Sequence, residues 1–375
     1  MIETIGILGG GQLGRMLTLE AKRMGYRVVT LEPAVDSPCG QVADDQIVAA
    51  YDDPRALHEL GERCDVVTYE FENIPLDAVL TLEREGRLVR PNGEVLRITQ
   101  DRLLEKTFVR SCGIATADFA AVHSRAGLDA ALAAVGLPAV LKTVRGGYDG
   151  KGQWLAHTPS DAEAAVDAAR GRPLIFERFV PFERELSIIC ARNGRGEAIA
   201  FPVTENVHDA GVLATTIVPA RVPTAVAERV RTAAQRIGEG LGIVGAYCVE
   251  FFHAGDDVFV NEIAPRVHNS GHYSLDATQI SQYEAHVRAI CDLPLVEPHL
   301  FAPAVMVNIL GEGTGDRLAG VNDLLRDPDV KLHMYGKAHA AARRKMGHFT
   351  VVARDVDDAL ARARTAKALL HWTAA

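Results

Sequence analysis

Two carboxylates in the second half of the chain have the spacing of facing residues in a β-hairpin. Glu250 lies in the apolar run Tyr-Cys-Val-Glu-Phe-Phe, and Glu262 lies in Val-Asn-Glu-Ile after a polar turn at residues 254–257. Facing carboxylates repel each other unless a cation lies between them. Hard divalent cations prefer oxygen ligands, and Asn261 adds a neutral oxygen. The hairpin therefore predicts a magnesium site with Glu250 and Glu262 as the metal ligands.

Donors of positive and neutral character follow this hairpin directly. Arg266, His268 and Asn269 lie on an irregular segment, next to the predicted metal ligands. Magnesium, a nucleotide phosphate and an anionic second substrate would explain this arrangement, and we take these three residues as the catalytic candidates. The alternative is a surface hairpin with solvated acids. The apolar residues that surround both acids favour a buried hairpin instead.

A glycine-rich loop at residues 142–153 indicates phosphate binding. It contains four glycines together with Lys142 and Lys151, follows one predicted strand and leads into another. It is not a Walker P-loop, because no Gly-Lys-Ser/Thr ending opens a helix. Glycine allows close approach of the backbone, and the lysines supply charge. A purely structural turn would not need this combination, so we expect a hairpin that folds over phosphates.

The N-terminal glycine loop allows several interpretations. Residues 9–14, Gly-Gly-Gly-Gln-Leu-Gly, follow a strand and open a helix, and Glu32 lies after the second strand. Taken alone, this pattern favours a dinucleotide whose phosphates meet the helix N-terminus. Another phosphorylated ligand, or glycines that serve only the turn, fit the same residues. A strand end at residues 177–180 with Glu185 nearby could bind an adenine edge and a ribose, although a solvated strand end is the simpler explanation.

Composition limits the class of protein. The chain has 375 residues, enough for two or three domains, and its net charge of -9 argues against general nucleic-acid binding. Its six cysteines are scattered without a Cys-x-x-Cys pair, which suits a reducing cytosol. No apolar run approaches the roughly 20 residues that span a bilayer, and no signal peptide is visible. We therefore expect a cytoplasmic protein without membrane or nucleic-acid partners.

Periodicity predicts an α/β organisation. Strands at 4–8, 27–31 and 65–69 alternate with helices, which implies a parallel sheet with right-handed crossovers. A small α/β unit follows at 119–177. Beyond it we expect antiparallel strands, a long helix at 224–241, the carboxylate hairpin and a C-terminal region, whose strands lie at 304–310, 331–335 and 348–353, before a final helix at 356–370.

The glycine-rich hairpin, the strand end and the paired carboxylates together resemble the ATP-grasp superfamily. Within it, four motifs are similar to the N5-carboxyaminoimidazole ribonucleotide synthetase family: Gly-Gly-Gly-Gln-Leu-Gly-Arg-Met near the start, Tyr-Glu-Phe-Glu-Asn-Ile at 69–74, Gly-Gly-Tyr-Asp-Gly-Lys-Gly-Gln at 146–153 and Asn-Glu-Ile-Ala-Pro-Arg-Val-His-Asn-Ser-Gly-His at 261–272. Tyr-Gly-Lys at 335–337 and Arg-Lys-Met-Gly-His at 344–348 extend the resemblance over essentially the whole chain.

The resemblance implies an ATP-grasp fold of the α/β and α+β classes. It implies a Rossmann-like N-terminal parallel-sheet domain at 1–100 and an ATP-grasp domain at 101–300, with a lid subdomain at about 115–180. A small C-terminal domain would occupy 301–375.

The implied activity is an ATP-dependent carboxylation in purine biosynthesis. ATP phosphorylates bicarbonate to carboxyphosphate, and the amine of 5-aminoimidazole ribonucleotide takes the carboxyl group, with release of ADP and phosphate. ATP and Mg²⁺ are implied, NAD and biotin are not, and a homodimer is expected. Another ATP-grasp ligase, such as a formate-dependent glycinamide ribonucleotide transformylase, is the alternative. A non-catalytic or redox nucleotide-binding protein is less compatible with paired metal carboxylates.

The resemblance also implies roles for particular residues. Glu250 and Glu262 would hold magnesium, while Arg266 and His268, beside Asn269, would hold bicarbonate, carboxyphosphate and the incoming amine. The expected ATP-binding residues are Arg97, Lys142, Gly147, Tyr148, Asp149, Gly150, Lys151, Gly152, Gln153, Glu177, Arg178, Phe179, Val180, Glu185, His208, Asn261 and Glu262. The expected ribonucleotide-binding residues are Gln12, Glu72, Asp149, Arg266, His268, Lys337, Arg344 and Lys345.

Overall fold

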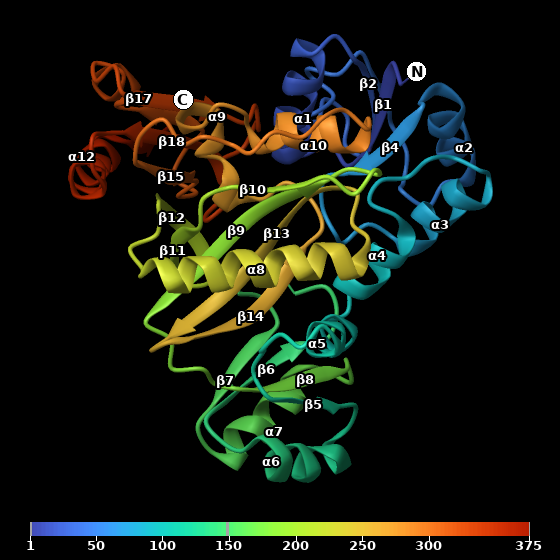
Figure 1. Ribbon diagram of the computed structural model, residues 1–375, viewed down its shortest axis with the longest axis vertical. Coiled ribbons are helices and arrows are strands. Elements are labelled where there is room, and N and C mark those ends of the chain that lie inside the picture. The colour runs from blue at the N-terminus through green and yellow to red at the C-terminus, as the bar shows by residue number, and fades with distance from the viewer. Residues whose placement is uncertain (1, 148–149, 375) are drawn as a thin grey trace.

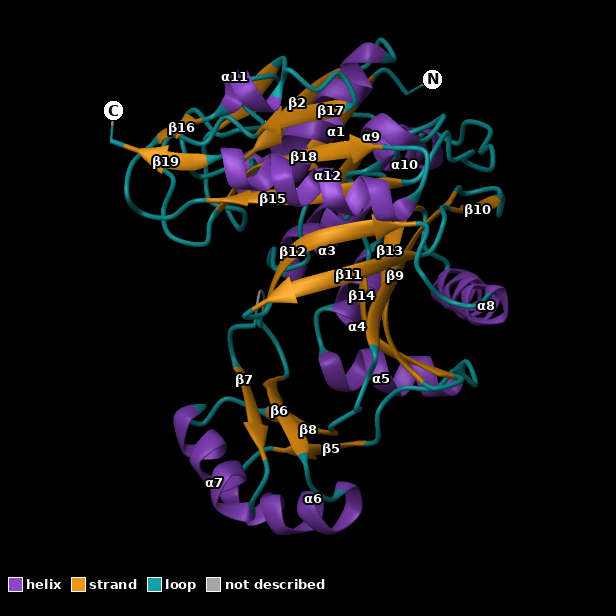
Figure 2. Cartoon of the chain, turned by 90° about the vertical axis from the view of Figure 1, so that its left-hand side faces the viewer, coloured by secondary structure: helices purple, strands orange, loops and turns teal. Residues whose placement is uncertain are grey.

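The architecture is that of a computed structural model, which describes residues 2–147 and 150–374. Figure 1 shows an N-terminal α/β unit at the upper right, a small α/β unit at the bottom and the C-terminal region at the upper left. A long curved sheet lies between them, and Figure 2 shows it from the side. None of the helices in the described ranges combines the length and the hydropathy that a bilayer crossing needs.

The N-terminal unit is a parallel sheet covered by helices, as its alternating pattern predicts. The strand order is β3-β2-β1-β4, and all three pairings are parallel. The strands are β1 (Thr4–Leu8), β2 (Arg27–Leu31), β3 (Asp45–Ile47) and β4 (Val66–Tyr69). The helices are α1 (Gln12–Arg23), α2 (Pro54–Arg63), α3 (Leu76–Arg84) and α4 (Gly93–Thr99).

Local sequence explains these elements. All four residues of β4 are buried, which a strand covered on both faces requires. Helix α1 buries Leu13, Met16 and Leu17, three residues at the helical spacing. Asp53 caps α2, because its side chain accepts hydrogen bonds from the backbone N–H groups of residues 55 and 56.

The small α/β unit begins after α5 (Arg102–Ser111). Its antiparallel sheet has the order β5-β8-β6-β7, and a hydrophobic cluster joins the sheet to two helices. The elements are β5 (Phe119–Val122), the short 3-10 helix η1 (Arg125–Gly127), α6 (Leu128–Val135), β6 (Ala139–Thr143), β7 (Gln153–Ala156), α7 (Pro159–Ala168) and β8 (Leu174–Arg178). The phosphate-loop candidate thus connects β6 to β7, as predicted.

The largest sheet of the described residues has nine strands, with the order β14-β13-β9-β11-β12-β15-β18-β17 and β10 paired to β9. It runs from the carboxylate hairpin into the C-terminal region without a break. Its strands are β9 (Arg184–Arg192), β10 (Ala198–Ala200), β11 (Thr204–Asp209), β12 (Val212–Val218), β13 (Gly245–Ala254), β14 (Asp257–Ala264), β15 (Ala304–Leu310), β17 (Val330–Met334) and β18 (Lys345–Val352).

The predicted hairpin is confirmed, because Ala254 pairs with Asp257 across the turn and Glu250 pairs with Glu262. Helix α8 (Thr224–Leu241) packs on this sheet. Its approach is close, since a Cβ on Gly238 would lie 2.0 Å from the Tyr247 hydroxyl oxygen. Strands β11 and β12, which were not predicted, connect the hairpin side of the sheet to β15.

Shorter elements complete the chain. After the hairpin come η2 (Asn269–Gly271), α9 (Ser274–Ala277) and α10 (Gln282–Ile290). The C-terminal region adds β16 (Arg317–Ala319), α11 (Val321–Leu324), α12 (Val356–Leu369) and β19 (His371–Thr373), with β16 paired to β19.

Candidate active site

A cavity of about 810 Å³ lies where the three parts of the molecule meet. The N-terminal unit contributes Gln12 and Glu72 to its lining, and the small unit contributes Lys142 and Glu177. The β13–β14 hairpin and the segment after it contribute the acids, Arg266 and His268. The fold therefore brings together side chains that are more than 200 residues apart in the sequence.

The paired carboxylates lie in this cavity with different surroundings. Burial and the neighbouring Glu262 carboxylate raise the pKa of Glu250 to about 7. Burial also acts to raise the pKa of Glu262, but the Arg102 guanidinium, helped by Lys142 and His268, outweighs it and brings the pKa down to about 2. Arg102 Nη1 lies 3.0 Å from Glu262 Oε2, and His268 Nε2 lies 3.3 Å from Glu250 Oε1. Glu262 is therefore negatively charged at neutral pH, whereas the negative charge of Glu250 would be stabilised by a bound cation.

A lysine cluster lies on the other side of Asn261. Lys142 Nζ donates to Glu177 Oε2 at 3.0 Å and to Asn261 Oδ1 at 3.2 Å. Lys106 is buried behind it, with Nζ 3.5 Å from Glu177 Oε2. Burial lowers the pKa of Lys106, although Glu177 opposes that shift. Glu177 is thus a buried acid that orients two ammonium groups next to the metal-ligand candidates.

A flatter, more apolar part of the cavity lies along the end of β8. Phe179, Val180 and Phe182 line it, and the Phe182 ring stacks on Phe252 at a centroid distance of 4.7 Å. Glu185 and His208 lie beside this surface, with His208 Nδ1 2.9 Å from Glu185 Oε2. Burial acts to lower the pKa of His208, but the Glu185 and Glu250 carboxylates together outweigh it and the pKa is raised. An aromatic ring with a neighbouring polar pair suits a nucleoside.

Arg266 and His268 line a further part of the cavity, next to the carboxylate pair. The Arg266 guanidinium Nε donates to the Glu72 carboxylate, and Nη1 donates to the Val267 carbonyl at 3.0 Å. His268 Nδ1 lies 2.9 Å from Ser270 Oγ. Burial lowers the pKa of His268 well below its usual value, and the Arg266 charge adds to this shift. His268 is therefore neutral, and Arg266 supplies the fixed positive charge.

Most of the predicted site residues line this one cavity. They are Gln12, Glu72, Lys142, Gly147, Gly150, Gln153, Glu177, Arg178, Phe179, Val180, Glu185, His208, Glu250, Asn261, Glu262, Arg266, His268, Asn269 and Lys345. Lys151, Gly152, Arg97, Lys337 and Arg344 are not among the lining residues. Tyr148 and Asp149 lie outside the described residues.

The predicted ATP contact of Arg97 has no support in its position. Arg97 lies on the exposed side of α4, and its guanidinium pairs with Glu94 at 2.7 Å, one turn earlier. Arg102 occupies the cavity instead. A signal for it was present in the sequence: an arginine in the first turn of a helix opposes the helix dipole and so indicates an acidic partner elsewhere.

Only one member of the predicted C-terminal phosphate cluster reaches the cavity. Lys345 lines it, whereas Lys337 Nζ donates to the Lys345 backbone carbonyl at 2.7 Å. Arg344 is exposed and its Nη1 donates to the His339 carbonyl at 3.0 Å. Lys337 thus supports the backbone that carries Lys345.

The interpretation of the N-terminal glycine loop as a phosphate site is contradicted by its hydrogen bonds. The backbone N–H groups of Gly11 and Gly14 donate to the buried Glu70 carboxylate, and Gly10 N–H donates to Glu32 Oε2 at 2.9 Å. A Cβ on Gly10 would lie 2.3 Å from Glu32 Cγ. Carboxylates of this chain therefore occupy the amides that a phosphate would need, and the glycines make room for them.

Comparisons with known proteins agree with this geometry. Residues 107–283 match the ATP-grasp domain, residues 2–100 match the ribonucleotide synthetase preATP-grasp domain, and residues 304–362 match the phosphoribosylaminoimidazole carboxylase C-terminal domain. The fold and the site thus define an ATP-grasp enzyme, with a mixed α/β architecture and a parallel N-terminal sheet, as the sequence predicts.

Full-length relatives narrow the class further. N5-carboxyaminoimidazole ribonucleotide synthases of Brucella melitensis and Bacillus subtilis are 47% and 43% identical to this chain, over 93% and 94% of it and 96% and 92% of the relatives. A crystal structure of such a synthetase with ADP has a TM-score of 0.91 at 43% identity and covers 97% of this chain and 96% of its own. An Aspergillus clavatus synthase with ADP and 5-aminoimidazole ribonucleotide has a TM-score of 0.90 at 30% identity, covering 98% of both chains.

The chain belongs to the N5-carboxyaminoimidazole ribonucleotide synthase family. The alternative of a formate-dependent transformylase is therefore disfavoured.

Proposed function

We propose that this cavity carries out the ATP-dependent carboxylation of 5-aminoimidazole ribonucleotide to N5-carboxyaminoimidazole ribonucleotide. The observation that carries the proposal is the meeting of three sets of groups in one cavity: the Glu250–Glu262 pair, the Lys142–Glu177 cluster, and Arg266 with His268. The carboxylate pair suits the magnesium ion that binds the ATP phosphates, and the Lys142–Glu177 cluster suits ATP itself. Arg266 and His268 suit the carboxyphosphate anion and the amine that accepts its carboxyl group. The products are ADP, phosphate and the carbamate.

ATP binding is proposed along the β8 end and the glycine loop. The Phe182–Phe252 stack and residues 177–180 would take the adenine, with Glu185 and His208 at the ribose. Lys142 and the loop at 147–153 would contact the phosphates, and we add Arg102 because it lines the cavity beside Glu262. A fixed guanidinium and a buried ammonium would stabilise the charge that develops during phosphoryl transfer.

The residues at the hairpin fit magnesium. Glu250, Glu262 and the Asn261 amide offer the oxygen ligands that a hard cation prefers. The raised pKa of Glu250, at about 7, is what an acid shows when burial and a neighbouring carboxylate disfavour its charge. Magnesium bound there would neutralise the phosphate oxygens of ATP.

Carboxylation is proposed beside Arg266 and His268. A bicarbonate oxygen attacks the γ-phosphorus, ADP leaves, and the carboxyphosphate formed lies against the Arg266 guanidinium. The amine nitrogen of the ribonucleotide then forms the C–N bond as phosphate leaves with the electron pair of the broken bond. His268 is neutral, and it would accept the amine proton at Nδ1, the ring nitrogen that in this structure accepts a hydrogen bond from the Ser270 amide. Glu72 holds Arg266 in place, and Gln12, Asn269 and Lys345 complete the ribonucleotide side.

The first experiment measures ADP release with Mg-ATP and bicarbonate, with and without 5-aminoimidazole ribonucleotide. Strong stimulation by the ribonucleotide, with one phosphate released per carboxylated product, is the expected result. ATP binding without stimulation would instead refute the carboxylase reaction for this cavity. The proposal also includes a homodimer in the cytoplasm, and sedimentation equilibrium that returned a monomer would refute the dimer alone.

A further inference from the structure

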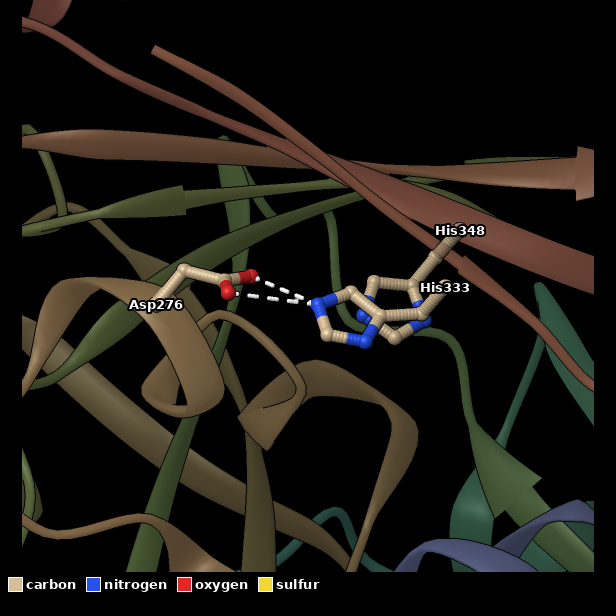
Figure 3. A group of neighbouring side chains, drawn as sticks. All are labelled: Asp276, His333 and His348. Carbon is tan, nitrogen blue, oxygen red and sulfur yellow. Dashed lines mark hydrogen bonds and ion pairs between the residues drawn. The ribbon is translucent and has the colours of Figure 1, made fainter. Parts of the chain in front are cut away.

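We propose that Asp276, His333 and His348 form a second metal site, outside the active-site cavity, that binds a divalent transition-metal ion such as Zn²⁺. The three side chains come from three different elements, α9, β17 and β18, and gather at one point in the structure (Figure 3). None of them lines the active-site cavity. The proposal does not depend on the function proposed above.

The backbone of the C-terminal sheet places the two histidines together. His333 and His348 are direct partners in the antiparallel β17–β18 pairing, so their side chains leave the same face of the sheet. Their rings stack with centroids 4.6 Å apart and an interplanar angle of 14°. Asp276 reaches this face from α9, which packs against β18. A cross-strand histidine pair with an acid opposite is therefore fixed by the fold itself.

The donor atoms of the three residues converge. His333 Nε2 lies 2.9 Å from Asp276 Oδ2 and 3.2 Å from Oδ1. One ligand atom from each residue falls within 4.8 Å of the other two. In Figure 3 one nitrogen of the His333 ring faces the Asp276 carboxylate, and the His348 ring overlaps the His333 ring. Ligands of a tetrahedral zinc lie about 3.3 Å apart, since Zn–N bonds are about 2.0 Å long. The His333–Asp276 spacing fits this already. The ligand atom of His348 lies within 4.8 Å of the other two, so an ion would draw it closer by up to about 1.5 Å.

His348 supplies the second, independent observation. Its side chain is fully buried, and its Nε2 has no hydrogen-bond partner among the described residues. Its Nδ1 is engaged with the Tyr335 hydroxyl at 2.8 Å. A buried imidazole nitrogen without a partner is costly, whereas a metal ion would satisfy it. The Tyr335 contact is the kind of supporting hydrogen bond that orients a metal-binding histidine.

The donor set selects the class of ion. Two imidazoles and one carboxylate suit zinc and its first-row neighbours, whereas magnesium prefers oxygen ligands such as those of the Glu250–Glu262 hairpin. The site also differs from an ordinary acid–histidine pair. His339 and Asp316 form such a pair at 3.1 Å, exposed and without a histidine partner across a strand. That pair provides a matched control.

Binding of Co²⁺ to metal-free protein tests the proposal. Excess Mg²⁺ is present throughout, so that the hairpin site does not contribute, and Co²⁺ is followed by its visible absorption and by calorimetry. We expect one equivalent of Co²⁺ with the intense band of a four- or five-coordinate ion, displaced by Zn²⁺. His333→Gln and Asp276→Asn should each weaken binding by at least about 10-fold. His339→Gln should bind as the unchanged protein does.

Circular dichroism and Mg-ATP binding establish that each variant is folded before titration. Asp276→Asn is the milder change, because the amide keeps the shape of the acid and leaves the buried His348 untouched. Zn²⁺ should also raise the melting temperature of the unchanged protein by about 3 °C at 100 times its dissociation constant. Absence of the Co²⁺ band in the unchanged protein, or a dissociation constant for Co²⁺ that rises by less than about 10-fold in either ligand variant, would overturn the proposal.

Discussion

Glu250 and Glu262 face each other across the β13–β14 hairpin, and their pKa values are shifted in opposite directions. Burial acts on both carboxylates, but only Glu262 has an arginine, Arg102, 3.0 Å away. The pair is therefore asymmetric before any ligand binds. Glu262 stays ionised at neutral pH, whereas Glu250 is only partly ionised there, and a bound cation would favour its charged form.

Glu262→Gln is expected to leave the protein folded and to reduce turnover by at least about 10²-fold, because the permanent charge of the proposed magnesium site is lost. Steady-state ADP release measures this effect. Glu239→Gln, on an exposed position of α8, is the control and should retain full activity. Near-normal turnover in Glu262→Gln would refute the metal assignment.

Arg102→Met is expected to lower kcat/KM for ATP by about 10²-fold, because it leaves the half-buried Glu262 carboxylate without its cation. Arg97→Met is the matched control, since Arg97 is exposed and pairs within its own helix. It should change kcat/KM by less than about 2-fold. An equal loss of kcat/KM in the two variants would indicate that Arg97 does contact ATP.

Lys345→Met is expected to raise the KM for the ribonucleotide about 10-fold and the KM for ATP less, because Lys345 lines the cavity on the side of His268. Lys337→Met should act in the same direction but more weakly, since Lys337 contacts the Lys345 backbone. Lys331→Met, an exposed change on β17, serves as the reference. A larger effect on ATP than on the ribonucleotide would contradict the placement of Lys345.

Protonation of His286 is expected to lower the free energy of unfolding in mild acid. Burial lowers its pKa to about 4, while its Nδ1 lies 3.0 Å from the Ala246 amide nitrogen and its Nε2 lies 3.0 Å from Thr68 Oγ1. An unfolded histidine takes up a proton near pH 6.5, so stability is complete above that pH and falls as the pH drops toward 4.

We expect a loss of about 2 kcal/mol from this residue between pH 7 and pH 5. Urea unfolding at each pH measures the loss, and His286→Gln should flatten the dependence. His299→Gln, at an exposed position, should not. An unchanged pH dependence in His286→Gln would show that other groups cause it.

The parts of the site that could be predicted from sequence are those with local signals. The Glu250–Glu262 hairpin follows from two apolar runs and the four-residue polar turn between them, and the resemblance extends the site to Arg266 and His268. The parallel N-terminal sheet follows in the same way from the strand–helix alternation. For these elements, the residues that decide the structure are close together in the chain.

Long-range partners could not be predicted. Arg102 donates a hydrogen bond to Glu262, which lies 160 residues later in the chain. Glu70 accepts a hydrogen bond from the Gly11 amide, 59 residues before it. Arg97 carries the same charge as Arg102, and only the fold shows that it faces solvent. Strand β11 was missed because most of its residues are polar, and its partner β12 was missed with it, although their pairing completes the sheet.

The unbroken sheet has a mechanical consequence. Strands β18, β15, β12 and β11 are successive hydrogen-bonded neighbours. The region beyond residue 303 therefore continues the central sheet and is not joined to it by a linker alone. His348 on β18 and His208 on β11 therefore belong to the same sheet. The C-terminal region is thus joined to the strand that carries His208 by an unbroken series of paired strands.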